Sequence, residues 1–143
     1  MTVFFSKKCE YALQAILLMA ASEDDCVCPA EEISKKLNIP KEFISKILQS
    51  LTNSGLVESK KGKGGGFKLA KQPSKIKLID IVEAIDGLES FNTCVLGFPN
   101  CSDKNPCPVH NKWGKLRSEA LKMLSEENLE SFKATTLKKI KSL

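Results

Sequence analysis

The sequence predicts a mainly α-helical fold with a small β-wing: a winged helix-turn-helix domain followed by a long C-terminal dimerisation helix. Three observations predict it. Apolar residues recur with helical periodicity in several segments. Two of these segments are short and only a few residues apart, which is typical of a helix-turn-helix. A glycine-rich loop between two short strand-like segments follows them, as in a wing.

The size and composition of the chain fit a small globular protein. Its 143 residues are 42% hydrophobic and 27% charged, which suggests one compact domain or a small domain with an extension. The apolar stretch at residues 11–21 is shorter than the roughly 20 residues needed to span a bilayer. It also lacks the small-residue cleavage site of a signal peptide. We therefore expect a cytoplasmic protein.

Residues 1–75 contain the elements of the predicted DNA-binding domain. Helical periodicity indicates a first helix over residues 7–21. Helices over residues 29–37 and 40–53 each begin with a proline, which suits the first helical position, and Gly55 ends the second of them. In that helix the residues expected to face inward are Phe43, Ile44, Ile47, Leu48 and Leu51.

The wing follows directly. Strands are expected over residues 56–60 and 67–70, and the loop between them at residues 61–66 has four glycines in six positions. Glycines allow the backbone to adopt positive φ and to approach another surface closely. A nucleotide-binding P-loop is disfavoured, because no Ser or Thr follows a Gly-Lys pair and no helix opens there.

Residues 76–143 form the second predicted part. A connecting helix over residues 77–86 precedes an irregular, proline-punctuated cysteine loop at residues 92–110. A long helix over residues 109–124 follows, and the tail at residues 126–143 is expected to form one more short helix. The narrow apolar seam of the long helix suits pairing with another helix and consists of Trp113, Leu116, Ala120 and Leu124.

The charge is uneven and favours a double-stranded DNA partner. Residues 40–77 carry nine lysines and two acidic residues, a local charge of +7, although a solvated lysine-rich surface would have the same composition. The N-terminal, outward face of the second helix of the motif is expected to meet base edges, and Lys61 and Lys63 at the wing tip to reach phosphates or the minor groove. The base-facing candidates are Lys41, Glu42, Ser45, Lys46 and Gln49.

Six cysteines indicate metal or redox chemistry if the protein is cytoplasmic. Cys94, Cys101, Cys107 and His110 follow the spacing C-x6-C-x5-C-x2-H, so three thiolates and the chain's one histidine could meet a single metal centre. From the spacing, an iron–sulfur cluster, zinc and free redox thiols all stay open. A thiol or zinc enzyme is disfavoured, because no second histidine is present. Cys26 and Cys28 are interpreted as bystanders, since C-x-C is a poor disulfide geometry in a regular element.

Four segments together resemble the Rrf2 family of bacterial transcription regulators, in particular the cluster-binding branch with IscR, NsrR and RirA. They are the glycine wing at residues 61–67, the Ser-Gly-Leu-Val step at 54–57, the helix at 81–86, and the cysteine loop followed by His110 and Trp113. The resemblance implies no enzyme activity. It implies a homodimer packed along the long helix, bound to a palindromic operator. It further implies that an iron–sulfur cluster, [2Fe-2S] ahead of [4Fe-4S], controls operator affinity and senses cluster status, nitric oxide or redox state.

The chain departs from the family pattern in the cysteine loop. The first gap is x6, where x5 is commoner. The fourth ligand differs among members, and here it is either His110 or a residue of the first helix of the partner subunit, Glu10 or the neighbouring Cys9. Two alternatives to an iron–sulfur regulator also remain. One is a cluster-free regulator like CymR that acts through a protein partner, and the other is a zinc- or thiol-based redox switch.

Overall fold

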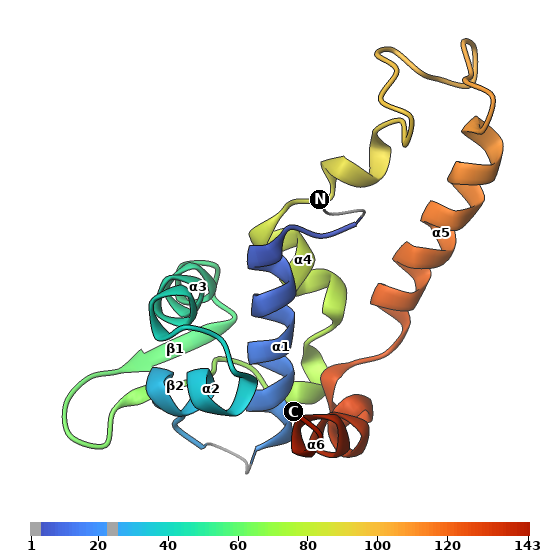
Figure 1. Ribbon diagram of the computed structural model, residues 1–143. Coiled ribbons are helices and arrows are strands. Elements are labelled where there is room, and N and C mark those ends of the chain that lie inside the picture. Colours follow the sequence, from blue (N-terminus) through green and yellow to red (C-terminus); the bar gives the residue numbers. More distant parts are fainter. Residues whose placement is uncertain (1–3, 23–25) are drawn as a thin grey trace.

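A computed structural model describes residues 4–22 and 26–143 (Figure 1). It is mainly helical with one two-stranded antiparallel sheet, which confirms the predicted fold class. The helices and strands are α1 (Lys7–Ala21), α2 (Ala30–Leu37), α3 (Lys41–Asn53), β1 (Val57–Lys60), β2 (Gly66–Leu69), α4 (Leu78–Ile85), α5 (His110–Glu126) and α6 (Lys133–Lys141). Single 3₁₀ turns are η1 (Pro73–Lys75), η2 (Glu89–Asn92) and η3 (Leu129–Phe132).

Helix α1 is the centre of the molecule. It packs against α2, α3, α4 and α6, and Figure 1 shows it between α3 on one side and α4 on the other. Alanines on several faces let these neighbours approach closely, since a methyl group adds little width to the helix. The buried residues of α1 are Cys9, Ala12, Ala15, Ile16, Leu18, Met19, Ala20 and Ala21.

The start of α1 is tied to the end of α4. Ser6 caps α1, and its hydroxyl oxygen accepts a hydrogen bond from the Cys9 backbone N–H at 3.0 Å. The backbone N–H of Ser6 donates to the carboxylate of Asp86, the C-cap residue of α4, at 2.8 Å, and the Ser6 hydroxyl donates to the same carboxylate. One serine therefore satisfies a helix end and joins two elements that are 80 residues apart in sequence.

The helix-turn-helix consists of α2 and α3. Pro29 and Pro40 lie one position earlier than predicted, as N-cap residues with extended ψ values of 145° and 136°. Their carbonyls accept the first hydrogen bonds of the two helices, while Asn38 ends α2 in a left-handed conformation with φ 56°. The predicted burial of Phe43 is wrong: the residue is 49% exposed and rests against Tyr11, with ring centroids 6.3 Å apart.

The wing contains a short third partner that the sequence analysis did not predict. Strands β1 and β2 pair from Val57 opposite Leu69 to Lys60 opposite Gly66. Beyond them, Cys28 and Phe67 exchange two backbone hydrogen bonds of 2.7 and 2.8 Å. Cys28, two residues before the start of α2, therefore pairs with β2 at one position and anchors the wing to the helix-turn-helix.

Gly66 lies so close to Cys28 that a substitution at Gly66 tests the anchoring of the wing. A Cβ on Gly66 would lie 2.6 Å from the Cys28 carbonyl oxygen, so Gly66→Ala should push the wing off its anchor and lower the free energy of unfolding by about 1–3 kcal/mol. Urea denaturation measures the effect. Ser59→Ala, on the exposed face of β1, is the control and should stay within about 0.5 kcal/mol of the parent. Equal stability of the two variants would contradict the anchor.

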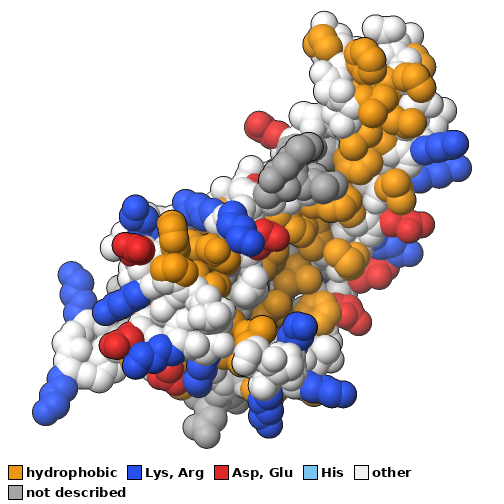
Figure 2. All heavy atoms as spheres, viewed as in Figure 1, with side chains coloured by type: hydrophobic (Ala, Val, Ile, Leu, Met, Phe, Trp, Pro, Cys, Tyr) orange, Lys and Arg blue, Asp and Glu red, His pale blue; other side chains and the backbone are white. Residues whose placement is uncertain are grey.

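The second half of the chain forms an arm, defined as η2, the cysteine loop and α5 (residues 89–126). Helix α5 is fastened at its C-terminal end, where Leu124 packs with Cys9, Val82 and Phe91 in a second apolar cluster. The predicted seam of α5 is therefore only partly free: Leu124 is 1% exposed, while Leu116 is 61% exposed. Figure 1 shows the arm projecting from the body, and Figure 2 shows hydrophobic side chains along it.

The C-terminal segment returns to the body. Helices η3 and α6 pack on α1, and the backbone N–H of Leu129 donates to the Ile76 carbonyl at 2.9 Å. The main hydrophobic core thus extends across the predicted boundary at residues 75 and 76, with Leu129 fully buried in it. The expected short tail helix is α6. Among the described residues, no helix has the length and apolar character needed to cross a membrane.

Candidate metal centre and nucleic-acid interface

The structure brings the three loop cysteines together. The sulfur atoms of Cys94, Cys101 and Cys107 all lie within 4.8 Å of one another, and those of Cys94 and Cys107 are 3.6 Å apart. All three side chains are half-buried. Thiolates at such separations have the spacing of ligands that share one metal centre, because metal–sulfur bonds are about 2.3 Å long.

Backbone turns, rather than helices or strands, position these thiols. The chain turns after Cys94, where the Gly97 N–H donates to the Cys94 carbonyl at 3.0 Å and Gly97 adopts φ 82°. The His110 N–H donates to the Cys107 carbonyl at 3.1 Å as α5 begins. Trp113 then fastens the other end of the loop, because its indole N–H donates to the Thr93 carbonyl at 3.1 Å.

His110 contacts the thiol group through Cys101. Its Nδ1 lies 3.2 Å from the Cys101 sulfur, while its Nε2 lies 2.9 Å from an Asp103 carboxylate oxygen. A carboxylate on one ring nitrogen orients the other nitrogen toward a metal, as is common around ligating histidines. Asp103 is not among the site residues predicted from the sequence. Its position between two loop cysteines was the one feature that could have indicated it. Exposed acidic residues are too common in loops for that position alone to identify a functional residue.

The electrostatics of the loop favour a thiolate at Cys94. Burial alone would raise its pKa, but backbone N–H groups of Phe98 and Leu96 and the neighbouring thiols stabilise the charged form more, so the pKa falls to about 7. The pKa of Cys107 is raised instead, first by burial and then by its thiol neighbours. Because the thiolate is the metal-binding form of cysteine, these N–H groups favour a ligand at Cys94.

The two candidates on α1 differ in accessibility. Cys9 is fully buried in its own subunit, and burial together with the Asp86 carboxylate raises its pKa to about 12. The side chain of Glu10 is 43% exposed and lies 3.6 Å from Lys7. Neither belongs to the thiol group formed by the described residues. Of these two candidates, only Glu10 has a side chain that is accessible at the surface.

The predicted DNA-contacting residues share one end of the molecule. On α3, Lys41, Glu42, Lys46 and Gln49 are exposed and Ser45 is half-buried. The wing-tip lysines, Lys61 and Lys63, are also exposed. A hollow of about 510 Å³ between α3 and the wing is lined by Gln49 and Lys61. Figure 1 shows α3 and the wing at the end of the molecule away from the cysteine loop.

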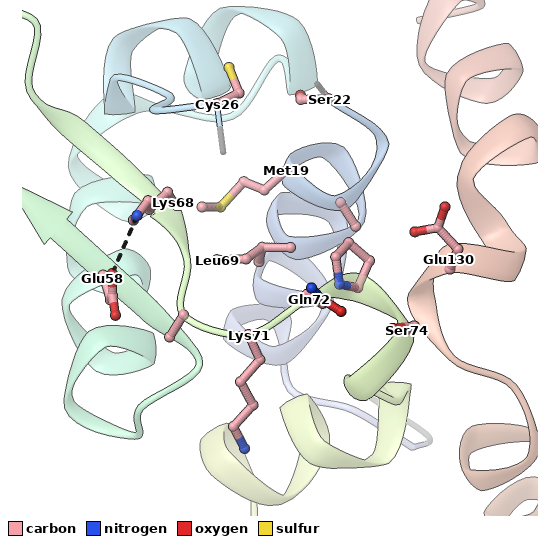
Figure 3. Close-up of a pocket in the computed structure, with 13 residues that line it drawn as sticks. Met19, Ser22, Cys26, Glu58, Lys68, Leu69, Lys71, Gln72, Ser74 and Glu130 are labelled. Carbon is pink, nitrogen blue, oxygen red and sulfur yellow. Dashed lines mark ion pairs between the residues drawn. The ribbon is translucent and has the colours of Figure 1, made fainter. Parts of the chain in front are cut away.

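A separate pocket of about 520 Å³ lies between β2, the end of α1 and η1 (Figure 3). Its lining includes the Glu58–Lys68 ion pair, with charged atoms 3.8 Å apart, together with Met19 and Cys26. No cysteine of the loop and none of the predicted DNA-contacting residues lines it. This pocket is therefore not the metal centre.

The helix-turn-helix, its wing and the lysines at that end define a winged-helix protein of the DNA-binding class. The family model described as "Iron-dependent Transcriptional regulator" (Rrf2) matches residues 5–135, nearly the whole chain. The chain therefore belongs to the Rrf2 family. It is a DNA-binding transcription regulator and not an enzyme, as the sequence predicts.

Relatives support this assignment, and solved structures share the fold. An HTH-type transcriptional regulator of Aquifex aeolicus is 38% identical over 138 residues, covering 95% of this chain and 90% of the relative. IscR of Photorhabdus laumondii is 29% identical over 125 residues, covering 87% and 76%. The structure of CymR, the global cysteine regulator of B. subtilis, matches with a TM-score of 0.77 at 22% identity, covering 94% and 98%. T. potens IscR matches with a TM-score of 0.71 at 23% identity, covering 91% and 86%.

The low pKa of Cys94 has a measurable consequence in the metal-free protein. Cys94 should be half-maximally alkylated by iodoacetamide near pH 7, because the thiolate that reacts is present above its pKa and lost below it. Cys28, whose pKa burial raises to about 11, serves as the internal control and should stay unlabelled up to pH 9. Mass mapping of the labelled peptides measures both. Equal labelling of the two cysteines at pH 7 would contradict the assignment.

Proposed function

We propose that this regulator binds its operator under the control of an iron–sulfur cluster held by Cys94, Cys101 and Cys107. The observation that carries the proposal is the approach of these three thiols to within 4.8 Å of one another. N–H groups aimed at Cys94 add support, because hydrogen bonds to sulfur stabilise the thiolate ligands of such clusters. When bound, the cluster would supply a centre whose charge and ligation respond to oxidants, nitric oxide or iron supply.

His110 is our choice for the fourth ligand. Its Nδ1 already faces Cys101 at 3.2 Å, and Asp103 holds the opposite nitrogen. Imidazole ligands are well known at [2Fe-2S] centres, so we favour that cluster type over [4Fe-4S]. Glu10 of a partner subunit is the alternative ligand, because its side chain is accessible at the surface.

We also propose a cytoplasmic homodimer that packs along α5. Leu116 and Met123 are about 60% exposed on that helix, at 61% and 59%, and Val95, Leu96 and Phe98 of the loop are exposed as well. Apolar side chains gathered on a projecting arm favour burial against a second copy. Two winged helices related by a two-fold axis would read a palindromic operator with half-sites about one helical turn, or 34 Å, apart.

The chain offers a route from the loop to the DNA-binding end. The base of α5 packs through Leu124 on Val82 of α4 and Cys9 of α1. Helix α1 in turn packs directly on α3, whose exposed face is the proposed base-reading surface. A shift of α5 at the dimer interface would therefore act on α1, and through α1 on the relative placement of the two recognition helices.

A cluster-free regulator remains the second candidate. The chain shares the fold of CymR, with a TM-score of 0.77, as it shares that of T. potens IscR, with a TM-score of 0.71. Such a protein would respond through a partner protein instead of a cofactor, and the thiol group would be free for zinc or for redox chemistry. The presence of three gathered cysteines with an oriented histidine favours the cluster.

Anaerobic purification tests the cluster directly. The protein should be brown, absorb in the visible range, and contain iron and acid-labile sulfide, whereas Cys94→Ala should lose the colour and most of the iron. Cys26→Ala is the matched control, since Cys26 is exposed and outside the thiol group, and it should keep both. A colourless protein carrying zinc, or no metal, would support the zinc or CymR-like alternative and overturn the cluster.

The wing contacts are tested by the salt dependence of operator binding. Each lost phosphate contact reduces the slope of log K against log salt by about 0.9, so Lys61→Ala/Lys63→Ala should flatten it by roughly 2 per subunit. Lys138→Ala/Lys139→Ala on α6 removes the same charge from exposed positions and should leave the slope unchanged. The wing assignment fails if the two double variants behave alike.

A further inference from the structure

A second pair of thiols lies outside the cysteine loop. The sulfur atoms of Cys26 and Cys28 are 3.8 Å apart, with Cys26 exposed and Cys28 only 5% exposed. No third cysteine, histidine or carboxylate among the described residues completes a metal-binding group with them. Two thiols at this distance, one of them open to solvent, have the arrangement of a dithiol that small oxidants reach through one partner.

The buried member of the pair is part of the wing. Cys28 exchanges backbone hydrogen bonds of 2.7 and 2.8 Å with Phe67 of β2, and its carbonyl lies against Gly66. A change in the backbone conformation at Cys28 would therefore alter its hydrogen bonds to β2, the strand that leads back from the wing tip. No other cysteine among the described residues pairs with the sheet.

Local structure permits a bond between the two sulfurs. In a regular strand or helix, C-x-C is a poor geometry for a disulfide, which is why the sequence alone predicts that Cys26 and Cys28 are bystanders. Cys26, however, lies in an irregular stretch before the bridge at Cys28. A disulfide bond is about 2.0 Å long, so the sulfurs at 3.8 Å must approach by roughly 1.8 Å. The irregular, exposed residue is free to supply most of that movement.

We propose that Cys26 and Cys28 form a reversible intramolecular disulfide that couples thiol redox state to the wing. The oxidant is a small-molecule disulfide. The Cys26 thiolate attacks one of its sulfurs, forms a mixed disulfide and releases one small thiol. The Cys28 thiol then loses its proton to solvent and attacks the Cys26 sulfur, which releases the second small thiol. Two protein thiols are oxidised and one small disulfide is reduced to two thiols.

The order of the two steps follows from accessibility. Cys26 is exposed and meets the oxidant first, whereas Cys28 is buried. Burial, and next the neighbouring Cys26, raise the pKa of Cys28 to about 11. Ring closure by Cys28 therefore accelerates as the pH rises, because more of its thiol is then in the thiolate form.

Peptide mapping tests the disulfide in the full chain. Protein treated with oxidised glutathione is unfolded, alkylated with iodoacetamide and digested with trypsin, which releases residues 9–35 with Cys9, Cys26 and Cys28 in one peptide. We expect one alkyl group and no glutathione on this peptide, and three alkyl groups after prior reduction. Cys28→Ser should trap glutathione on Cys26, and Cys26→Ser should keep two alkyl groups. A wild-type peptide with three alkyl groups, or with glutathione retained on Cys26, overturns the proposal.

The coupling to the wing needs its own measurement. Amide hydrogen exchange at Cys28 and Phe67 should change when the disulfide forms, and operator affinity should change by at least about fivefold, reversed by dithiothreitol. Cys26→Ser treated in the same way is the control and should show neither effect. A disulfide that forms without altering exchange in the wing overturns the coupling. The affinity readout rests on the proposed function: if neither redox form binds DNA, that function fails while the peptide mapping and exchange results still decide the disulfide.

Discussion

The burial of α1 is the constraint on which the rest of the structure depends. A helix that is covered on nearly every face must be narrow, and Ala12, Ala15 and Ala20 keep it so while α2, α3, α4 and α6 pack around it. Its residues belong to both apolar clusters, with Ile16 in the main core and Cys9 in the second. Since the hydrophobic effect scales with buried apolar area, burial of this one helix contributes to the stability of both halves.

This arrangement explains how one small chain can contain two separate working ends. The helices and strands of the DNA-binding end share the main hydrophobic core with α1. The cysteine loop, in contrast, is held by backbone turns and by single contacts such as that of Trp113 with Thr93. The hydrogen bonds from Ser6 to Asp86 join the start of α1 to the end of α4. The body thus presents a loop that gathers three thiols and is fastened by few contacts.

Much of this architecture could be predicted, because periodicity and glycine content are local signals. The bounds of α1 and the existence of the wing followed from them. Phe43 was misplaced because periodicity shows which residues share a face but not whether another element covers that face. Phe43 meets the ring of Tyr11 but stays 49% exposed. The pairing of Cys28 with Phe67 could not be predicted, since a single bridge is set by how α2 is placed against the sheet. Cysteine spacing indicated the thiol group, whereas Asp103 depended on the course of the loop.

The approach of Gly66 to the Cys28 carbonyl has a consequence for how this sequence can change over evolutionary time. With only 2.6 Å available to a Cβ, the position excludes every other amino acid for as long as the backbone pair beside it persists. The nineteen alternatives are rejected by shape alone, without regard to polarity or size class. A homologue with a side chain at this position must therefore have released its wing from the segment before α2. In sequences whose structures are unknown, a side chain at this position therefore indicates a wing without this anchor.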